Sequence, residues 1–134
     1  MQLDPRYGYY PRWPEDGDEW IHPQDVEVTR KMIPSFRVWR SDRNDGPFAI
    51  VSYGEIHVRL RPSIWIQVAG EGIDIGDWVE VKSRLQKNTY QIARVCEMRW
   101  DVYQRCIAYR VQGNQYTIPT SYYRADLRPI DPLQ

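Results

Sequence analysis

The sequence has few of the residues on which metal sites and many active sites depend. It contains two cysteines and two histidines in 134 residues. Two cysteines are too few for a structural zinc site, and His22 and His57 are not spaced to complete one. Neither histidine has a serine, cysteine or carboxylate at a spacing that suggests a catalytic triad. Phosphate-binding glycine loops and metalloprotease motifs are also missing. We therefore expect a non-enzymatic protein with no catalytic residues, no cofactor and no metal.

The sequence also has no excess of charge of either sign and no long apolar run. Lysine and arginine total 18, as do aspartate and glutamate, so the formal net charge is zero. A neutral chain gives no electrostatic reason to expect nucleic acid or a membrane surface as the partner. Every hydrophobic run is far shorter than the roughly 20 apolar residues of a membrane helix, and the first residues have no apolar signal-peptide core. The composition predicts a cytoplasmic protein without membrane contact.

Aromatic residues are abundant, with six tryptophans and ten tyrosines. Such residues favour β-strands and are equally common in cores and at interfaces. Residues 1–23 mix them with four prolines, which interrupt helix and sheet interiors. This mixture predicts an extended, irregular arm, yet a disordered segment should be poor in aromatics. The arm either packs across its own chain or docks onto a partner or a second copy.

One phrase occurs twice, which suggests a duplicated unit. Val26–Arg30 reads VEVTR, and Val79–Arg84 reads VEVKSR. Each copy opens a series of short β-branched and aromatic stretches separated by turn residues. The sequence thus predicts an all-β protein with an arm at 1–23, a first unit at 24–68, a linker at 69–76 and a second unit at 77–134.

Turn residues divide each unit into short strands. The first unit has a strong hairpin signal at Asn44-Asp45-Gly46 and a second turn at Gly54. Its expected strands are 25–31, 35–41, 47–53, 55–60 and 64–68. The expected strands of the second unit are 77–84, 90–98, 105–111, 115–119 and 128–130.

The two cysteines fall in the central hairpin of the second unit. If residues 92–110 form a hairpin centred near Asp101, Cys96 lies directly opposite Cys106. Such a pair reaches disulfide distance only with suitable local geometry. A reducing compartment favours two thiols, and both states stay open at this point.

Four segments of the second unit carry a family resemblance: Gly76–Val81, Ala93–Val95, Ile107–Val111 and Ala125–Ile130. Together they resemble the SH3-like barrels of the Tudor and KOW type. In those folds a Gly-Asp pair opens the first strand, and a one-turn helix ending in leucine leads into the last. The first unit shares only the opening phrase and the strand spacing. The resemblance implies two small SH3-like barrels in tandem.

The same resemblance implies that the protein binds a ligand or partner and does not catalyse a reaction. Tudor-like members often form an aromatic cage for a methylated cation, and KOW-like members often bind RNA or ribosome and polymerase partners. The second unit departs from the Tudor pattern, because Val111-Gln112-Gly113 replaces the Tyr-Gly pair that often follows the third strand. The residues that would line such a barrel mouth are Tyr90, Trp100, Tyr103, Tyr116 and Tyr122.

Arginines and aromatics alternate along the central hairpin of the second unit, and we expect Trp100 and Tyr103 at its tip. This composition clamps single-stranded nucleic acid in some proteins, and it also describes an ordinary solvated sheet face with cross-strand ion pairs. We expect an interaction module with a protein partner, and RNA- or ribosome-associated binding through the hairpin at 94–110 is the alternative. The expected ligand-binding residues are Tyr90, Arg94, Arg99, Trp100, Tyr103, Arg105, Tyr116 and Tyr122.

Overall fold

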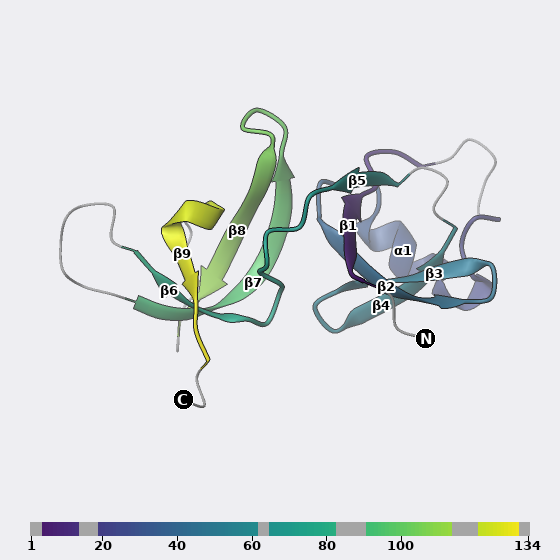
Figure 1. Cartoon of the computed structure of the whole chain (residues 1–134). Coiled ribbons are helices and arrows are strands. Elements are labelled where there is room, and N and C mark those ends of the chain that lie inside the picture. Colours follow the sequence, from purple (N-terminus) through teal and green to yellow (C-terminus); the bar gives the residue numbers. More distant parts are fainter. Residues whose placement is uncertain (1–3, 14–18, 62–64, 83–90, 114–120, 132–134) are drawn as a thin grey trace. The chain divides into compact units, whose positions relative to one another are not determined.

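The computed structural model describes residues 4–13, 19–61, 65–82, 91–113 and 121–131. The chain divides into two compact units, Met1–Gly70 and Glu71–Gln134. Each unit is built on one antiparallel sheet (Figure 1). Strands dominate, as the all-β prediction requires, and the described pairings do not close either sheet into a barrel. Among the described residues, no helix combines the length and apolarity that crossing a membrane demands.

The sheet of unit 1 has five strands in the order β4-β3-β2-β1-β5, and all neighbours are antiparallel. A further single bridge joins Ile21 to Leu60 at the β4 edge. The strands are β1 (Arg6–Tyr9), β2 (Trp39–Asp45), β3 (Phe48–Tyr53), β4 (Ile56–Leu60) and β5 (Ile66–Val68).

Two glycines make the hairpins of this sheet, as predicted. Asp45 pairs with Phe48 across a two-residue turn, in which Gly46 has a φ of 58°. Proline at the second turn position fixes a negative φ there, so a positive φ is needed only at the first position, as in a type II′ turn. Gly54 has a φ of 62° in the turn between β3 and β4.

The prediction of an irregular N-terminal arm is wrong for residues 6–9. These residues form β1, which lies between β2 and β5. Tyr7 and Tyr9 are buried, and Gly8 between them has no side chain. A Cβ at Gly8 would overlap the ring of Trp65. Prolines therefore flank the strand without interrupting it, and the aromatics of this segment belong to the core of unit 1.

The first copy of the repeated phrase is helical, so the predicted strand at 25–31 is wrong. A 3-10 helix η1 (Pro23–Asp25) leads into α1 (Val26–Met32). Proline in the first turn, acid at the start and basic residues in the last turn all favour a helix. The second copy lies in strand β6, so the phrase does not mark a structural repeat.

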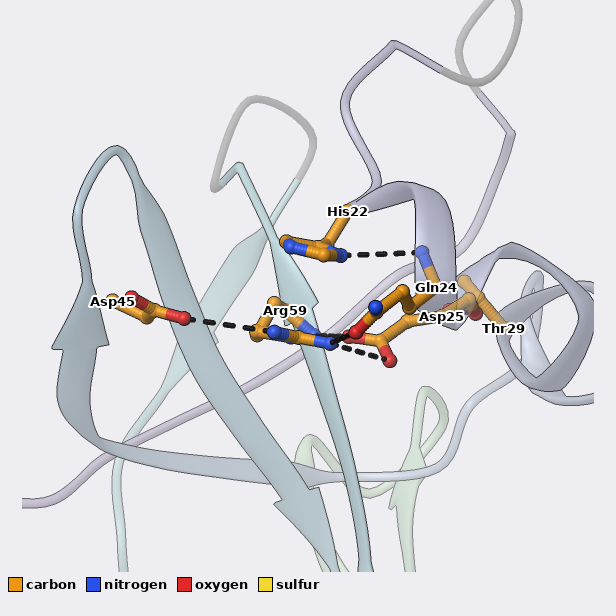
Figure 2. Close-up of polar contacts among 6 residues, drawn as sticks. All are labelled: His22, Gln24, Asp25, Thr29, Asp45 and Arg59. Atoms are coloured by element: carbon orange, nitrogen blue, oxygen red, sulfur yellow. Dashed lines mark hydrogen bonds and ion pairs between the residues drawn. The ribbon is translucent and has the colours of Figure 1, made fainter.

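The start of α1 is fastened to β4 by an ion pair (Figure 2). Asp25 Oδ2 lies 2.8 Å from Arg59 Nε and also accepts the backbone N–H of Arg59 at 2.8 Å. Arg59 donates further to Asp25 Oδ1 at 3.2 Å and to the side chain of Gln24 at 3.1 Å. Because Arg59 donates these bonds, the pKa of Asp25 is lower than usual. This bidentate pair positions the helix on the sheet.

The core of unit 1 is rich in aromatic rings. Tyr10 packs against Trp20 and Trp65 with ring centroids 5.8 and 5.4 Å apart. Trp39 is fully buried and lies 5.6 Å from the ring of Tyr53. Aliphatic side chains of the sheet and of Ile33 complete this cluster. Aromatic burial supplies much of the apolar area that a unit of this size needs.

The sheet of unit 2 has the order β8-β7-β6-β9, again antiparallel. A single bridge joins Tyr122 to Tyr109 at the β8 edge. The elements are β6 (Trp78–Val81), β7 (Gln91–Asp101), β8 (Cys106–Gln112), η3 (Arg124–Asp126) and β9 (Leu127–Pro129). The predicted strand at 115–119 lies outside the described residues.

Alternation along the strands gives unit 2 one buried face and one outer face. The segment before β6, predicted as a linker, forms neither helix nor strand, yet Ile73 is fully buried. Glu71 from the same segment accepts a hydrogen bond of 2.8 Å from Tyr109 Oη. The buried face consists of Val79, Val81, Ala93, Val95, Met98, Ile107, Tyr109, Val111 and Leu127.

The predicted cysteine pairing is wrong. Cys106 pairs with Asp101, and the register shifts between Val95 and Glu97, so that Cys96 bulges from β7. Both thiols are free. The hairpin is centred between Asp101 and Cys106, and the loop comes later in the chain than the composition suggested.

The ion pair on α1 yields a stability prediction. Asp25→Asn should lower the free energy of unfolding by about 1–2 kcal/mol, because the half-buried Arg59 guanidinium loses its charged acceptor. Urea denaturation followed by tryptophan fluorescence measures this change. Asp45→Asn is the matched control, since Asp45 is 57% exposed and lies 3.7 Å from the same arginine. Its effect should stay below about 0.5 kcal/mol.

The sign of the pH dependence follows from the lowered pKa of Asp25. The stabilisation by the carboxylate is complete above the ordinary pKa of an aspartate and is lost as the pH falls through the lowered value. The stability difference between the unmodified chain and Asp25→Asn should therefore shrink as the pH falls below the ordinary pKa of an aspartate. A difference that is the same at pH 7 and in strong acid would show that the charge plays no part.

Candidate functional site

Six of the eight predicted ligand-binding residues lie in the described part of unit 2. Tyr90 and Tyr116 lie outside the described residues. The other six do not form one cluster, because they occupy the outer sheet face, the buried face, the β7–β8 loop and the β8 edge. The six are Arg94, Arg99, Trp100, Tyr103, Arg105 and Tyr122.

Two of the hairpin arginines are engaged within unit 2. Arg94 is exposed, and its Nε donates a 2.9 Å hydrogen bond to the carbonyl of Gly76. Arg110 lies 3.6 Å from the carboxylate of Glu97 on the paired strand. These contacts are those of an ordinary solvated sheet face. Arg99 is exposed on the same face, two positions before the end of β7.

Trp100 is not at the tip of the hairpin. It pairs with Ile107, which is fully buried, and paired residues of an antiparallel ladder share one face. Trp100 is half-buried on that face. It therefore extends the core of unit 2 toward the end of the sheet.

Tyr122 also has a structural position. Its backbone N–H and C=O exchange hydrogen bonds of 2.8 and 2.7 Å with Tyr109 on β8. The half-buried side chain stands beside the fully buried Tyr109. Burial and the hydrogen bond to Glu71 raise the pKa of Tyr109, so this phenol stays protonated.

Residues 102–105 form the loop between β7 and β8, which we call the hairpin tip. The carboxylate of Asp101 folds this loop. Its Oδ1 accepts the backbone N–H groups of Tyr103 and Gln104, both at 3.0 Å. The carbonyl of Asp101 accepts the N–H of Arg105 at 2.8 Å. Arg105 has a φ of 54°, a left-handed conformation that closes the loop.

A second contact ties the hairpin tip to η3. The phenol of Tyr123 donates a 2.7 Å hydrogen bond to Asp101 Oδ2. The backbone N–H of Tyr123 donates to Asp126 Oδ2 at 2.9 Å, which caps η3. The bond from Tyr123 and the two loop N–H groups hold the pKa of Asp101 below its usual range. Both oxygens of one carboxylate thus fix the tip.

The hairpin tip displays apolar surface that the described part of unit 2 leaves exposed. Tyr103 is 92% exposed and Val102 is 45% exposed. Gln104 and Arg105 are exposed beside them. An exposed tyrosine on a loop held by a network of hydrogen bonds is suited to contact another molecule. The sequence correctly indicated Tyr103 at the tip, and it missed Asp101 and Tyr123, which hold the tip in place.

Histidine, cysteine and acidic side chains of the described residues form no metal-binding group. No group of three or more His, Cys, Asp and Glu side chains in that part of the chain is placed to hold a metal ion. His22 accepts the N–H of Gln24 at 3.2 Å through Nδ1 and packs edge-on against Phe48, with ring centroids 5.4 Å apart. His57 is exposed on β4. Burial raises the pKa of both cysteine thiols, which disfavours the reactive thiolate.

Comparison with known proteins assigns the chain to a family but gives no activity for it. No curated protein matches the chain, and no solved structure matches it. One family model spans residues 1–128, nearly the whole chain and both units. The chain therefore belongs to the family of unknown function DUF6960.

Proposed function

We propose that this protein is a non-enzymatic interaction module and that the hairpin tip is its contact surface for a protein partner. One observation carries the proposal. Tyr103 is 92% exposed although its loop is fixed by the carboxylate of Asp101. No described residue of the unit covers the Tyr103 side chain, and its loop is held in place. The ring is therefore positioned to contact another molecule.

The physical advantage of the tip is preorganisation. Ordering a loop on binding costs about 0.5–1.5 kcal/mol for each immobilised side chain. Here the backbone is already fixed by three hydrogen bonds to Asp101, counting those from Tyr103, Gln104 and Arg105. Tyrosine adds a large contact area with only two rotatable side-chain bonds. Partner binding through the tip therefore has a low entropic cost.

The architecture of unit 2 supports an SH3-like type for this unit. In the order β8-β7-β6-β9, the last strand pairs with the first, and η3 leads directly into that last strand at Leu127. The resemblance implies a one-turn helix at this place, and η3 supports it. We limit this proposal to unit 2, since unit 1 has a helix where the resemblance needs a first strand.

The charge of the chain and the contacts of its hairpin arginines favour a protein partner over nucleic acid. Of the hairpin arginines, Arg94 and Arg110 have contacts within unit 2, and the formal net charge of the chain is zero. Nucleic-acid binding draws its affinity from many basic side chains that face phosphates. Arg99 and Arg105 alone offer little of that kind. Nuclease treatment in the experiment below distinguishes the two partners.

Removing the exposed ring tests the proposal. Tyr103→Ala should abolish recovery of a partner when the tagged full chain is purified from native lysate and bound proteins are identified by mass spectrometry. The stability of the chain should stay within about 0.5 kcal/mol, because the ring packs on nothing in the described unit. Ile92→Ala is the matched control, since Ile92 is 61% exposed on the outer face of the same unit.

Three results would count against the proposal. Equal recovery with Tyr103→Ala would exclude the tip as the contact. Equal loss with Ile92→Ala would indicate a different surface. Loss of the partner after nuclease treatment would show that nucleic acid mediates the contact, in which case binding should also weaken steeply as salt rises.

The role of Asp101 gives a separate prediction. Asp101→Ala removes the acceptor of the Tyr103 and Gln104 N–H groups and of the Tyr123 phenol. Hydrogen exchange of those two amides, measured by NMR, should accelerate by a factor of roughly five or more. Asp101→Asn keeps one carbonyl acceptor and is the control, with exchange close to that of the unmodified chain. Unchanged exchange in Asp101→Ala would mean that the side chain does not hold the loop.

A further inference from the structure

The two described sheets have four edge strands, and these differ in how their outer sides are covered. The edge strands are β4 and β5 in unit 1, and β8 and β9 in unit 2. An edge strand presents backbone N–H and C=O groups that can pair with another chain, and proteins usually cover or block such groups. The contacts of each edge therefore indicate where a further strand could add.

The later half of the β4 edge is covered by the segment that leads into α1. Arg59 N–H donates to Asp25 Oδ2 at 2.8 Å, and the Arg59 carbonyl accepts the N–H of His22 at 2.9 Å. Two residues further on, the N–H of Arg61 donates to the carbonyl of Trp20 at 2.7 Å. These backbone groups are therefore already occupied within unit 1.

Both edges of unit 2 are blocked as well. On β8, Tyr109 exchanges two backbone hydrogen bonds with Tyr122. On β9, the N–H of Leu127 donates to the carbonyl of Arg124, and the Leu127 carbonyl accepts a 2.9 Å bond from the Arg124 guanidinium. Pro129, the last residue of β9, has no N–H. A strand that approached either edge would have to displace these contacts.

The β5 edge has no such cover among the described residues. Ile66, Gln67 and Val68 pair with β1 on one side. On the other side, no described residue forms a backbone hydrogen bond with them. The three residues include no charge and no proline, and their register with β1 contains no bulge. Of the usual devices against strand addition, β5 has only its short length.

The described contacts fix β5 on β1 at both ends. The Trp65 ring lies against Gly8 and packs on Tyr10 with ring centroids 5.4 Å apart, which holds the start of β5. Just after the end of β5, the Tyr7 ring lies against Gly70. At both glycines a Cβ would overlap the neighbouring ring. An added strand therefore meets a formed edge, and ordering this edge costs little entropy on binding.

Apolar side chains lie beside this edge on one face of the sheet. Ile66 is 44% exposed and pairs with Tyr9, so the two side chains share a face. The Tyr9 ring packs against Phe36 with centroids 5.8 Å apart, and Phe36 is 41% exposed. The side chains of an added strand alternate between the two faces. Every second one therefore falls on the face of Ile66 and extends its apolar surface.

We propose that the β5 edge is a second interaction surface, which binds an extended segment of a partner protein by strand addition. The segment pairs its backbone with β5 as a sixth strand of the five-stranded sheet and places an apolar side chain beside Ile66. Backbone hydrogen bonds supply the affinity, and the side chain beside Ile66 supplies the selectivity. This surface belongs to unit 1 and does not depend on the hairpin tip.

Random peptides displayed on phage are the probe. They are selected on the full chain with Tyr103→Ala, so that the ring of the hairpin tip contributes nothing. Selected peptides should have apolar residues at every second position, and synthetic copies should bind the unmodified chain. Hydrogen exchange of the outward-facing β5 amides, measured by NMR, should slow by a factor of roughly five or more when the peptide is bound.

Ile66→Lys and Ile56→Lys are a matched pair of variants. The two isoleucines are 44% and 39% exposed and lie on the two edge strands of one sheet. Ile66→Lys should weaken peptide binding by roughly tenfold or more, because a lysine on an edge opposes strand pairing. Ile56→Lys should bind like the unmodified chain. Circular dichroism and thermal unfolding check that both variants fold.

The decisive measurement changes the peptide backbone and leaves every side chain in place. N-methylation removes one N–H donor at a time. In an added strand, alternate amides face β5 and the others face away. Methylation should therefore lower the affinity by roughly tenfold or more at every second position and change it little in between. This alternation separates strand addition from docking of side chains alone.

Four outcomes would overturn the inference. They are a selection that yields no binding peptide, binding that Ile66→Lys leaves intact, equal loss with Ile56→Lys, and methylation effects without alternation. Sedimentation velocity of the unmodified chain tests the other occupant. Association that Ile66→Lys abolishes would assign the edge to a second copy in place of a partner segment.

The outcome is independent of the proposed function, because the peptides are selected on a chain without the Tyr103 ring. The lysate experiment keeps the two surfaces apart in the same way. Proteins bound at the β5 edge should be recovered with Tyr103→Ala and lost with Ile66→Lys. Proteins bound at the hairpin tip should show the opposite pattern.

Discussion

Each unit must bury one face of a small sheet, and most of its structure follows from this constraint. No disulfide is available, since Cys96 and Cys106 are free thiols. Units of about 65 residues sit near the size at which apolar burial barely outweighs chain entropy. Unit 1 meets the constraint by drawing its N-terminal aromatics into the sheet and its core. Unit 2 meets it with alternation along β6 to β8, interrupted at the Cys96 bulge, and with Ile73 from the preceding segment.

Features with local causes could be predicted from the sequence, and features with distant causes could not. The hairpin turns at Gly46 and Gly54 depend on the turn residues themselves. Whether Val26–Met32 is a helix or a strand depends in part on Arg59, which reaches Asp25 from 34 positions away. The phrase VEV is compatible with both states, because valine takes the structure that its surroundings impose. Its recurrence therefore indicated a duplication that the fold does not contain.

The candidate site shows the same division. Arginine and aromatic composition indicated the hairpin between β7 and β8 as the candidate site, and Tyr103 lies at its tip. The register was wrong because Asp101 starts a four-residue loop and the bulge at Cys96 shifts the ladder. Trp100 was assigned to the tip on that register and belongs to the buried face instead. Tyr123 was missed because its phenol meets Asp101 across 22 positions of chain.

The position of β1 sets the order in which unit 1 is completed during synthesis. Tyr7 pairs with Val68, so the first strand meets the last across 61 positions. The β2–β4 hairpins need only short turns, whereas the β1–β5 pair closes a long loop at a larger entropic cost. A ribosome-bound chain can form the hairpins early, but the aromatic N-terminal strand has its second neighbour only after residue 68 has emerged. During that interval the tyrosines of β1, which are buried in the complete unit, stay accessible to solvent and to other chains.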